Sequence, residues 1–172
     1  MHSFRITKYN PLNRDKNGYY KKDEWTSVSD VGQEYSDEIV TFESYILYEN
    51  AYIDAVLRIM SQNNVDYFEV QRLQIKFYKD YPDFIEPESK DFFNSLANKM
   101  LLSNNDITKI IRFNLREIIW CKLVNSQMYV HFGYDYYMYI GCKSISESVI
   151  NAIETDGLFV ETFISPYIQA SE

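Results

Sequence analysis

The stretch that decides the fold spans residues 127–164 and reads QMYVHFGYDYYMYIGCKSISESVINAIETDGLFVETFI. Apolar and polar side chains alternate over Gln127–Phe132 and again over Asp135–Ile140, and a period of two is typical of strands. Gly133-Tyr134 separates these two runs. We therefore predict an antiparallel hairpin over these residues.

The second half of this stretch returns from helix to strand. Ser144 and Glu147 have the spacing of a capping box, which predicts a helix that ends at Gly157. Leu158–Ile164 alternates again, as a final strand does. Residues 127–164 thus predict a C-terminal β-β-α-β unit.

The clearest element upstream is a helix over Phe42–Gln62, with Thr41 as its N-cap. Its apolar positions share one face, and Glu49 interrupts that face. The remaining predicted elements are a strand over Ser3–Tyr9, a short helix or turn over Trp25–Gly32, a strand or a strand plus a turn over Val65–Ile75, a helix over about 89–101 and a helix from Ser103 or Asn104 to about Ile119 or Lys122.

The length of 172 residues suits one domain, so we assign residues 1–172 to a single domain. The order of the predicted elements gives the α+β class. We expect several helices packed on a small antiparallel sheet, with the β-β-α-β unit at the C-terminal end.

The net charge of −8 bears on the kind of partner. The first 24 residues hold six Lys/Arg and three Asp/Glu, whereas the other 148 hold eleven and twenty-two. Binding to nucleic acid takes most of its affinity from basic side chains that contact phosphates, so this acidity argues against a nucleic-acid partner. It favours a basic protein partner instead.

The sequence gives three indications of compartment. No apolar signal core follows Met1, and no apolar run approaches the roughly 20 residues that cross a bilayer. A core of this size needs no disulfide, so we expect Cys121 and Cys142 to be reduced. We therefore expect a cytoplasmic protein with no membrane partner.

Motifs for catalysis and metal binding are absent from the sequence. There is no Gly-x-Ser-x-Gly, no Cys-x-x-Cys, no His-Glu-x-x-His and no phosphate-binding glycine loop. We expect no cofactor and no metal ion. His131 has two interpretations, which are a general base near neutral pH and a strand histidine hydrogen-bonded to a neighbour.

Glu49 also has two interpretations. An ionised carboxylate on a buried helix face is costly unless it is paired, and an unpaired one acquires a raised pKa suited to acid–base catalysis. The alternative is a structural glutamate that accepts hydrogen bonds from tyrosine hydroxyls or an arginine. An enzyme that uses Glu49 or His131 is therefore the alternative to a non-catalytic binding protein.

Two segments combine acids with aromatic side chains. Residues 80–91 read DYPDFIEPESKD, and their acids include Asp80, Asp83, Glu86 and Glu88. This segment is either a solvated acidic loop or a recognition loop for a basic protein surface. The second segment holds Tyr134, Asp135 and Tyr136. Tyrosine is enriched at interfaces because it gives a large rigid contact area, so we predict partner-binding residues here.

Four sets of residues carry a resemblance to a family of small bacterial proteins. They are Phe4-Arg-Ile-Thr-Lys-Tyr-Asn-Pro11 with Arg14, Gly18, Tyr20, Glu24-Trp-Thr-Ser27 and Ser29-Asp30; Tyr52-Ile53; Trp120-Cys-Lys-Leu123; and His131-Phe-Gly-Tyr-Asp-Tyr-Tyr-Met-Tyr-Ile140. Some members of that family resemble immunity proteins of polymorphic-toxin or contact-dependent growth-inhibition systems. The resemblance implies a non-enzymatic protein that binds a cognate toxin domain, often a nuclease, and blocks it.

The residues and the resemblance together predict a cytoplasmic immunity protein. Its partner would be a basic RNase or DNase domain whose active site it occludes, with Asp80, Asp83, Glu86, Glu88, Tyr134, Asp135 and Tyr136 as contact residues. A mobile-element-encoded acidic inhibitor that mimics nucleic acid remains a further alternative, beside the enzyme that uses Glu49 or His131.

Overall fold

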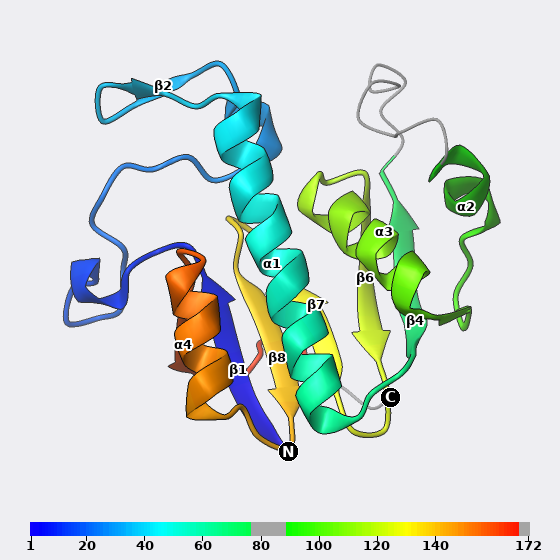
Figure 1. Cartoon of the computed structure of the whole chain (residues 1–172). Coiled ribbons are helices and arrows are strands. Elements are labelled where there is room, and N and C mark those ends of the chain that lie inside the picture. The colour runs from blue at the N-terminus through cyan, green and yellow to red at the C-terminus, as the bar shows by residue number, and fades with distance from the viewer. Residues whose placement is uncertain (77–88, 169–172) are drawn as a thin grey trace.

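The computed structural model describes residues 1–76 and 89–168, and it confirms the α+β class (Figure 1). Over these residues, the main sheet has seven strands in the order β5-β4-β6-β7-β8-β1-β9, and every pairing is antiparallel. The strands are β1 (His2–Thr7), β4 (Phe68–Ile75), β5 (Leu101–Leu102), β6 (Ile119–Val124), β7 (Tyr129–Phe132), β8 (Met138–Cys142) and β9 (Phe159–Thr162).

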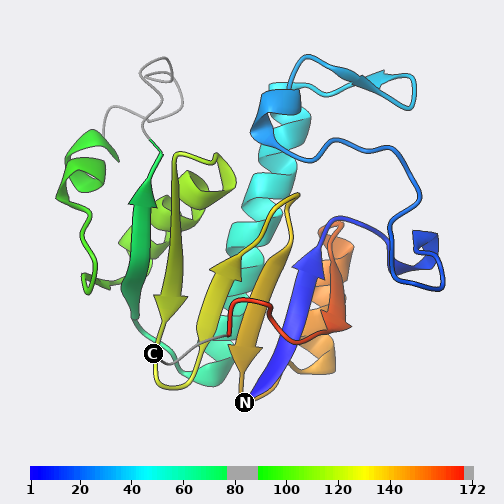
Figure 2. The same ribbon diagram turned by 180° about the vertical axis from the view of Figure 1, so that it is seen from behind.

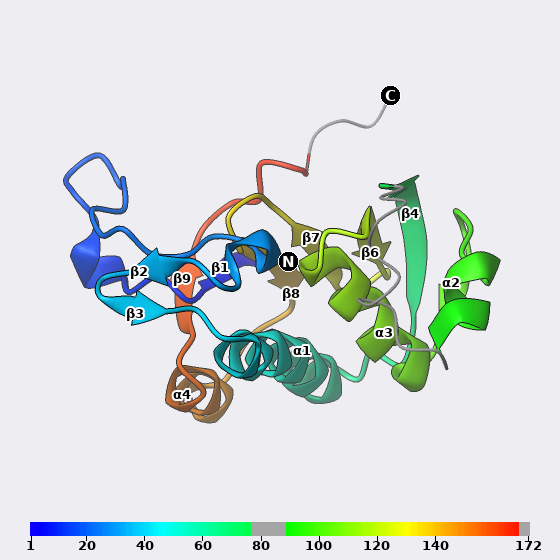
Figure 3. The ribbon, with the colours of Figure 1, turned by 90° about the horizontal axis from the view of Figure 1, so that it is seen from above.

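The two faces of the sheet are covered differently. The helices are α1 (Phe42–Asn63), α2 (Lys90–Ser95), α3 (Asn104–Leu115) and α4 (Glu147–Thr155), with short 3₁₀ turns at Pro11–Asn13 and Val28–Asp30. Helices α1, α3 and α4 lie on one face, as the view from above shows (Figure 3). The C-terminal segment after β9 crosses the other face (Figure 2).

Helix α1 confirms the prediction for Phe42–Gln62. The Thr41 side chain accepts a hydrogen bond from the Ser44 backbone N–H, and the Ser44 hydroxyl oxygen accepts one from the Thr41 N–H. The helix ends where Asn64 takes a left-handed conformation with φ of 53°, which asparagine tolerates. The face that was expected to be apolar is buried against the sheet and α3, with Glu49 among its buried residues.

The predicted C-terminal unit is present as β7, β8, α4 and β9. Its last strand does not pair with β8, because β1 lies between β8 and β9 and pairs with both. The N-cap of α4 is Ser146 rather than Ser144, and its hydroxyl accepts from the Val149 N–H. Gly157 follows the helix with φ of +88°, as predicted for a glycine in the C′ position.

The helix predicted from Ser103 or Asn104 begins as expected, but the prediction that it ends at about Ile119 or Lys122 was wrong. Helix α3 ends at Leu115, and Ile119–Val124 form strand β6, which pairs with β4 on one side and β7 on the other. Most residues of this central strand are buried, so a run that is apolar apart from Lys122 has the same appearance as a buried helix face. The helix predicted over 89–101 is also shorter, because α2 ends at Ser95 and Leu101–Leu102 form β5.

A second, two-stranded sheet projects from the body near the start of α1 (Figure 1). Its strands are β2 (Glu34–Tyr35) and β3 (Glu38–Ile39), and Tyr35 pairs with Glu38. Ser36 and Asp37 connect them, with φ angles of 52° and 67°. Two left-handed residues in succession match the right-handed twist of a tight hairpin. We call residues 34–39 the acidic hairpin.

Candidate protein-interaction surface

The predicted contact residues fall into two groups. Asp80, Asp83, Glu86 and Glu88 lie outside the described residues. Tyr134, Asp135 and Tyr136 lie in the loop that joins β7 to β8, between Phe132 and Met138. Tyr134 thus lies in the connection, as predicted. The prediction that Asp135 and Tyr136 belong to the strand over Asp135–Ile140 was wrong, because both residues lie in the turn that precedes β8.

The β7–β8 loop is a tight turn. The Gly133 N–H donates to the Tyr137 carbonyl at 2.7 Å, and the Tyr137 N–H donates to the Tyr134 carbonyl at 3.1 Å. Asp135 and Tyr136 both have left-handed backbones, with φ of 53° and 57°. Such a conformation is unfavourable for a bulky side chain, so other contacts must hold Tyr136 there.

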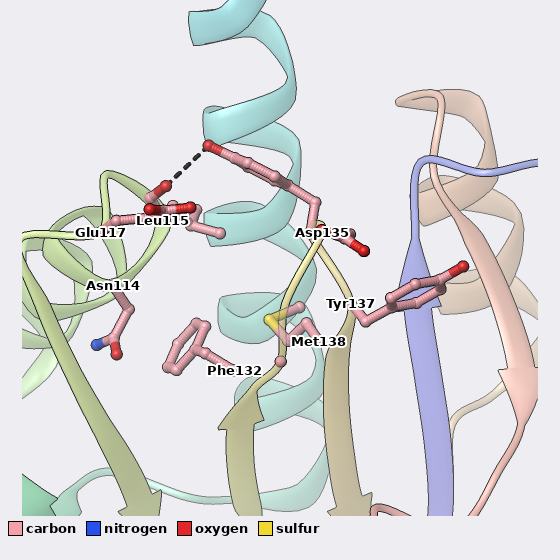
Figure 4. Close-up of a pocket in the computed structure, with 9 residues that line it drawn as sticks. Asn114, Leu115, Glu117, Phe132, Asp135, Tyr137 and Met138 are labelled. Atoms are coloured by element: carbon pink, nitrogen blue, oxygen red, sulfur yellow. Dashed lines mark hydrogen bonds between the residues drawn. The ribbon is translucent and has the colours of Figure 1, made fainter. Parts of the chain in front are cut away.

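Those contacts place Tyr136 in the core. Its side chain is only 6% exposed, and its hydroxyl donates to the Leu115 carbonyl at 2.8 Å, the bond marked in Figure 4. Its ring meets Trp25 edge-on, with centroids 5.3 Å apart. Tyr134, by contrast, is 81% exposed. The loop thus presents Tyr134 and the exposed Asp135 to a partner, while Tyr136 fixes the position of the loop.

Two adjoining hollows lie beside this loop. The smaller has a volume of about 30 Å³ and is bounded by Asp135 on the loop and Glu117 after α3 (Figure 4). The larger, of about 270 Å³, is lined by Trp120, Tyr134 and Tyr167 among others, and it shares Glu117 with the smaller one. We call the larger one the loop hollow. Lys76 also lines it, so this hollow is of mixed charge.

A larger groove lies between the acidic hairpin and the body. Its volume is about 500 Å³, and its described lining residues are Lys22, Asp23, Glu24, Trp25, Tyr35, Ser36, Glu38, Ile39, Val40, Thr41, Ser44 and Tyr48. The acidic hairpin forms one wall, residues 22–25 form another, and the first turns of α1 complete it. We call it the hairpin groove. Three of these described lining residues are acids and one is a base.

An internal lysine lies behind the groove. The Lys8 side chain is 1% exposed, and its Nζ lies 3.3 Å from Glu24 Oε2 and 4.2 Å from the centre of a Trp25 ring. Nζ is also 4.5 Å from the Tyr9 ring centre and 5.8 Å from that of Tyr48. Burial lowers the pKa of the Lys8 amine, while Glu24 acts in the opposite direction. This is an aromatic and carboxylate cage for an ammonium group.

The charge around the hairpin groove follows from the sequence. Between Asp23 and Leu57 there are nine acids and no lysine or arginine. Six of these acids are exposed. Five of them, Asp23, Glu34, Asp37, Glu38 and Glu43, lie on residues 22–25, the acidic hairpin or the first turn of α1, whereas Asp54 lies about three turns further along α1, away from the lining of the groove. The acidic hairpin, the start of α1 and the β7–β8 loop all lie toward the same end of the molecule (Figures 1 and 2). That end therefore combines negative charge with exposed aromatic surface.

Glu49 accepts hydrogen bonds from a tyrosine hydroxyl and from arginines, as its interpretation as a structural glutamate requires. The residue is fully buried, and its carboxylate accepts from Arg116 Nε at 2.7 Å, from Arg112 Nε at 2.8 Å and from the Tyr45 hydroxyl at 3.0 Å. These bonds join α1 to α3 and its C-cap. Glu49 lines neither the hairpin groove nor the loop hollow.

His131 is likewise enclosed by its neighbours. It is 4% exposed, its Nδ1 lies 2.8 Å from Ser165 Oγ, and its ring stacks on Tyr129 with centroids 4.4 Å apart. Burial, with a smaller contribution from the charge on Lys122, lowers the pKa of His131 to about 4. The geometry is that of a strand histidine hydrogen-bonded to a neighbouring segment.

Cys121 and Cys142 are free thiols, as expected, and both are buried. Burial raises the pKa of Cys121 to about 12 and that of Cys142 to about 11. Within residues 1–76 and 89–168, no three His, Cys, Asp or Glu side chains converge as metal ligands do. None of the helices in these ranges has the length and apolar character that crossing a bilayer requires.

Comparison of the chain with protein-family models, with curated proteins and with solved structures found no match. The function therefore has to be argued from the surface itself. Sequence reasoning missed the hairpin groove, although a signal for it was present. A run of 35 residues without a lysine or arginine, from Asp23 to Leu57, is unusual in a chain in which 24% of residues are charged.

Proposed function

We propose that this protein is an immunity protein, which binds a basic bacterial toxin domain of the nuclease type and blocks its active site. The single observation that carries the proposal is the acidic end of the molecule. Three acids, Asp23, Glu24 and Glu38, line a groove of about 500 Å³ in which Lys22 is the one base among the described lining residues, and no lysine or arginine occurs from Asp23 to Leu57. A nuclease cleft is basic because it binds phosphates, so its charge is complementary to this surface.

The proposed mechanism is occlusion. Carboxylates at the acidic end take the place of substrate phosphates, and exposed side chains such as Tyr134 and Ile39 supply apolar contact area. Charge complementarity speeds association and sets specificity, while a few central contacts set the dissociation rate. The sequence of 80–88 adds Asp80, Asp83, Glu86 and Glu88 to the acids available for this role.

Two features of the described residues support a binding role over acid–base catalysis. Glu49 is neutralised by two arginines, and His131 is hydrogen-bonded inside the fold. The hairpin groove is lined instead by three acids and the aromatic residues Trp25, Tyr35 and Tyr48, with Lys22 as the one base among its described lining residues. Such a lining suits the recognition of cationic side chains.

The test is co-expression with the toxin domain encoded directly upstream. We expect growth rescue and co-purification of the two proteins in a one-to-one complex. A variant carrying Asp23→Asn, Glu38→Gln and Asp135→Asn should lose rescue at low expression. Asn tolerates the left-handed backbone of residue 135, so this change removes charge without straining the loop.

The matched control removes three exposed acids elsewhere, through Asp54→Asn, Asp66→Asn and Glu147→Gln. It should rescue growth as the unchanged protein does. Failure of the unchanged protein to bind or rescue against that toxin, or turnover of a substrate by the purified chain, would overturn the proposal. Capture of a host nucleic-acid-binding protein in place of a toxin would favour the alternative of a nucleic-acid mimic.

A further inference from the structure

We infer that the hairpin groove is a subsite for a lysine side chain of the partner, carried on an extended segment that lies between the acidic hairpin and the start of α1. This inference rests on the proposed function, since it assumes a basic protein partner. It goes beyond that function because it names the chemical group of the partner that binds, a lysine ammonium. It also places this binding in the hairpin groove and not in the loop hollow.

One wall of the groove already contacts an ammonium group from inside the fold. Lys8 Nζ contacts the Glu24 carboxylate at 3.3 Å and the Trp25 ring at 4.2 Å, with the Tyr48 ring at 5.8 Å. Glu24, Trp25 and Tyr48 also line the groove. These three residues therefore contact an ammonium group on their inner side, in the arrangement of rings and a carboxylate around a cation.

Two parts of the groove lining, residues 22–25 and the acidic hairpin, carry unneutralised negative charge. Asp23 and Glu38 line the groove and are exposed, and in the described chain neither has a salt-bridge partner within 4.0 Å. The lone base among the described lining residues is the exposed Lys22. A cation that enters the groove thus meets two carboxylates that no internal base neutralises.

Apolar surface also lies beside these acids. Ile39 is 65% exposed on β3 and lines the groove, together with the ring of Tyr35. A lysine has a four-carbon stem that packs on apolar surface while its ammonium reaches a carboxylate. The lining of the groove provides both an apolar side chain, Ile39, and a carboxylate, Glu38.

The loop hollow is less suited to a cation. Glu117 and the rings of Trp120, Tyr134 and Tyr167 line it, but Lys76 lines it as well. The described lining of the loop hollow thus has one acid and one lysine, whereas that of the hairpin groove has one lysine, Lys22, and three acids, of which only Glu24 is paired with Lys8. The excess of negative charge in the hairpin groove therefore attracts a lysine side chain more strongly. Each of the two hollows is lined by one of the two tryptophans of the chain, Trp25 in the hairpin groove and Trp120 in the loop hollow. The signal of each tryptophan therefore reports which hollow a lysine enters.

The test uses the purified chain without a toxin. The peptide acetyl-(Gly-Lys)₄-amide is titrated at low salt while the indole N–H signals of Trp25 and Trp120 are followed by NMR. The variant Trp120→Phe assigns the two signals. The control peptide carries an acetyl group on every lysine side chain, which keeps its shape and removes its charge.

We expect the lysine peptide to shift the Trp25 signal and leave the Trp120 signal in place, and we expect the acetylated peptide to shift neither. The double variant Asp23→Asn with Glu38→Gln should weaken binding by at least about fivefold, because two exposed ion pairs are lost. The control pair Asp54→Asn with Asp66→Asn should weaken it by less than about twofold.

A shift confined to Trp120, equal binding of the acetylated peptide, or a groove variant that binds as well as the control variant would each overturn the inference. These outcomes would leave the proposed function standing, since growth rescue by the unchanged protein tests that function separately. Conversely, failure of rescue together with a lysine-specific Trp25 shift would overturn the immunity role and keep the groove as a site for basic peptides.

Discussion

Arg116 Nε lies 2.7 Å from Glu49 Oε2, and Arg116 Nη2 lies 3.0 Å from Glu49 Oε1. A guanidinium at the end of α3 thus binds, through two parallel hydrogen bonds, a carboxylate that is buried in α1. Such bidentate pairs are both strong and directional. This pair fixes the position of α3 against α1.

Removing that carboxylate should destabilise the fold. In Glu49→Gln, the buried Arg116 loses its counter-charge, and we expect the free energy of unfolding to fall by about 3 kcal/mol or more. Urea denaturation measures this change. The control Glu43→Gln alters an exposed acid of the same helix and should stay within about 0.5 kcal/mol of the unchanged protein. Equal stability of the two variants would contradict a structural role for Glu49.

Stability should fall at mildly acidic pH because of His131. Its pKa is about 4 in the folded protein and about 6.5 in the unfolded chain. Between these values the unfolded chain binds a proton that the folded protein does not, so the free energy of unfolding falls as the pH falls from 6.5 to 4. The loss from this group is at most about 3 kcal/mol.

The measurement is the free energy of unfolding as a function of pH, for the unchanged protein and for His131→Gln. The variant lacks this titration, so the unchanged protein should lose stability relative to it on acidification. His2→Gln, at the exposed end of the chain, serves as the control and should follow the unchanged protein. Parallel curves for all three proteins would show that His131 has an ordinary pKa.

The acids of residues 80–88 should act on association with the partner. Replacing Asp80, Asp83, Glu86 and Glu88 with serine should slow association and flatten its dependence on salt, because long-range attraction is screened by ions. Stopped-flow or biosensor kinetics measure both effects. The control replaces four exposed acids elsewhere: Asp54, Asp66, Glu147 and Glu154. Identical association rates for the two variants at every salt concentration would remove this segment from the interface.

Gly141 should tolerate no larger residue without loss of stability. It lies opposite Tyr129 in the β7–β8 pair, and a Cβ atom built on it would fall 1.9 Å from Tyr129 Cε1. The ring would have to leave its stack on His131 and its hydrogen bond with Ser3, which is 2.7 Å long. We expect Gly141→Ala to lower the free energy of unfolding by about 1–3 kcal/mol. Gly18→Ala, where a Cβ meets nothing within 4 Å, isolates the cost of backbone strain alone.

The errors in the secondary-structure prediction have a common physical cause. Ile119–Val124 is apolar apart from Lys122, because β6 lies between β4 and β7 and most of its residues are buried on both faces of the sheet. Periodicity separates helix from strand only where one side of an element faces water. Tyr136 was placed among the contact residues for a similar reason, since the sequence does not tell which tyrosines of a turn fold inward.

The candidate site was predicted only in part. Acidity and tyrosine content pointed to a basic partner, and Tyr134 with Asp135 lies on exposed surface. The hairpin groove was not predicted, because its walls come from residues 22–25, the acidic hairpin and the start of α1, which meet only in the folded chain. The lysine cage behind it joins β1 to the same segments.

Local patterns by themselves determined helix α1 with its Thr41 cap and the β7–β8 hairpin, since each depends on residues that are close in sequence. The order of the predicted elements determined the α+β class, and composition determined the net negative charge. Tertiary structure alone decided which charges are neutralised and which stay available. Glu49 and Glu24 meet their basic partners from distant parts of the chain, whereas Asp23 and Glu38 remain exposed at the groove. The reason is that an ion pair depends on distance in space, which spacing along the chain does not specify.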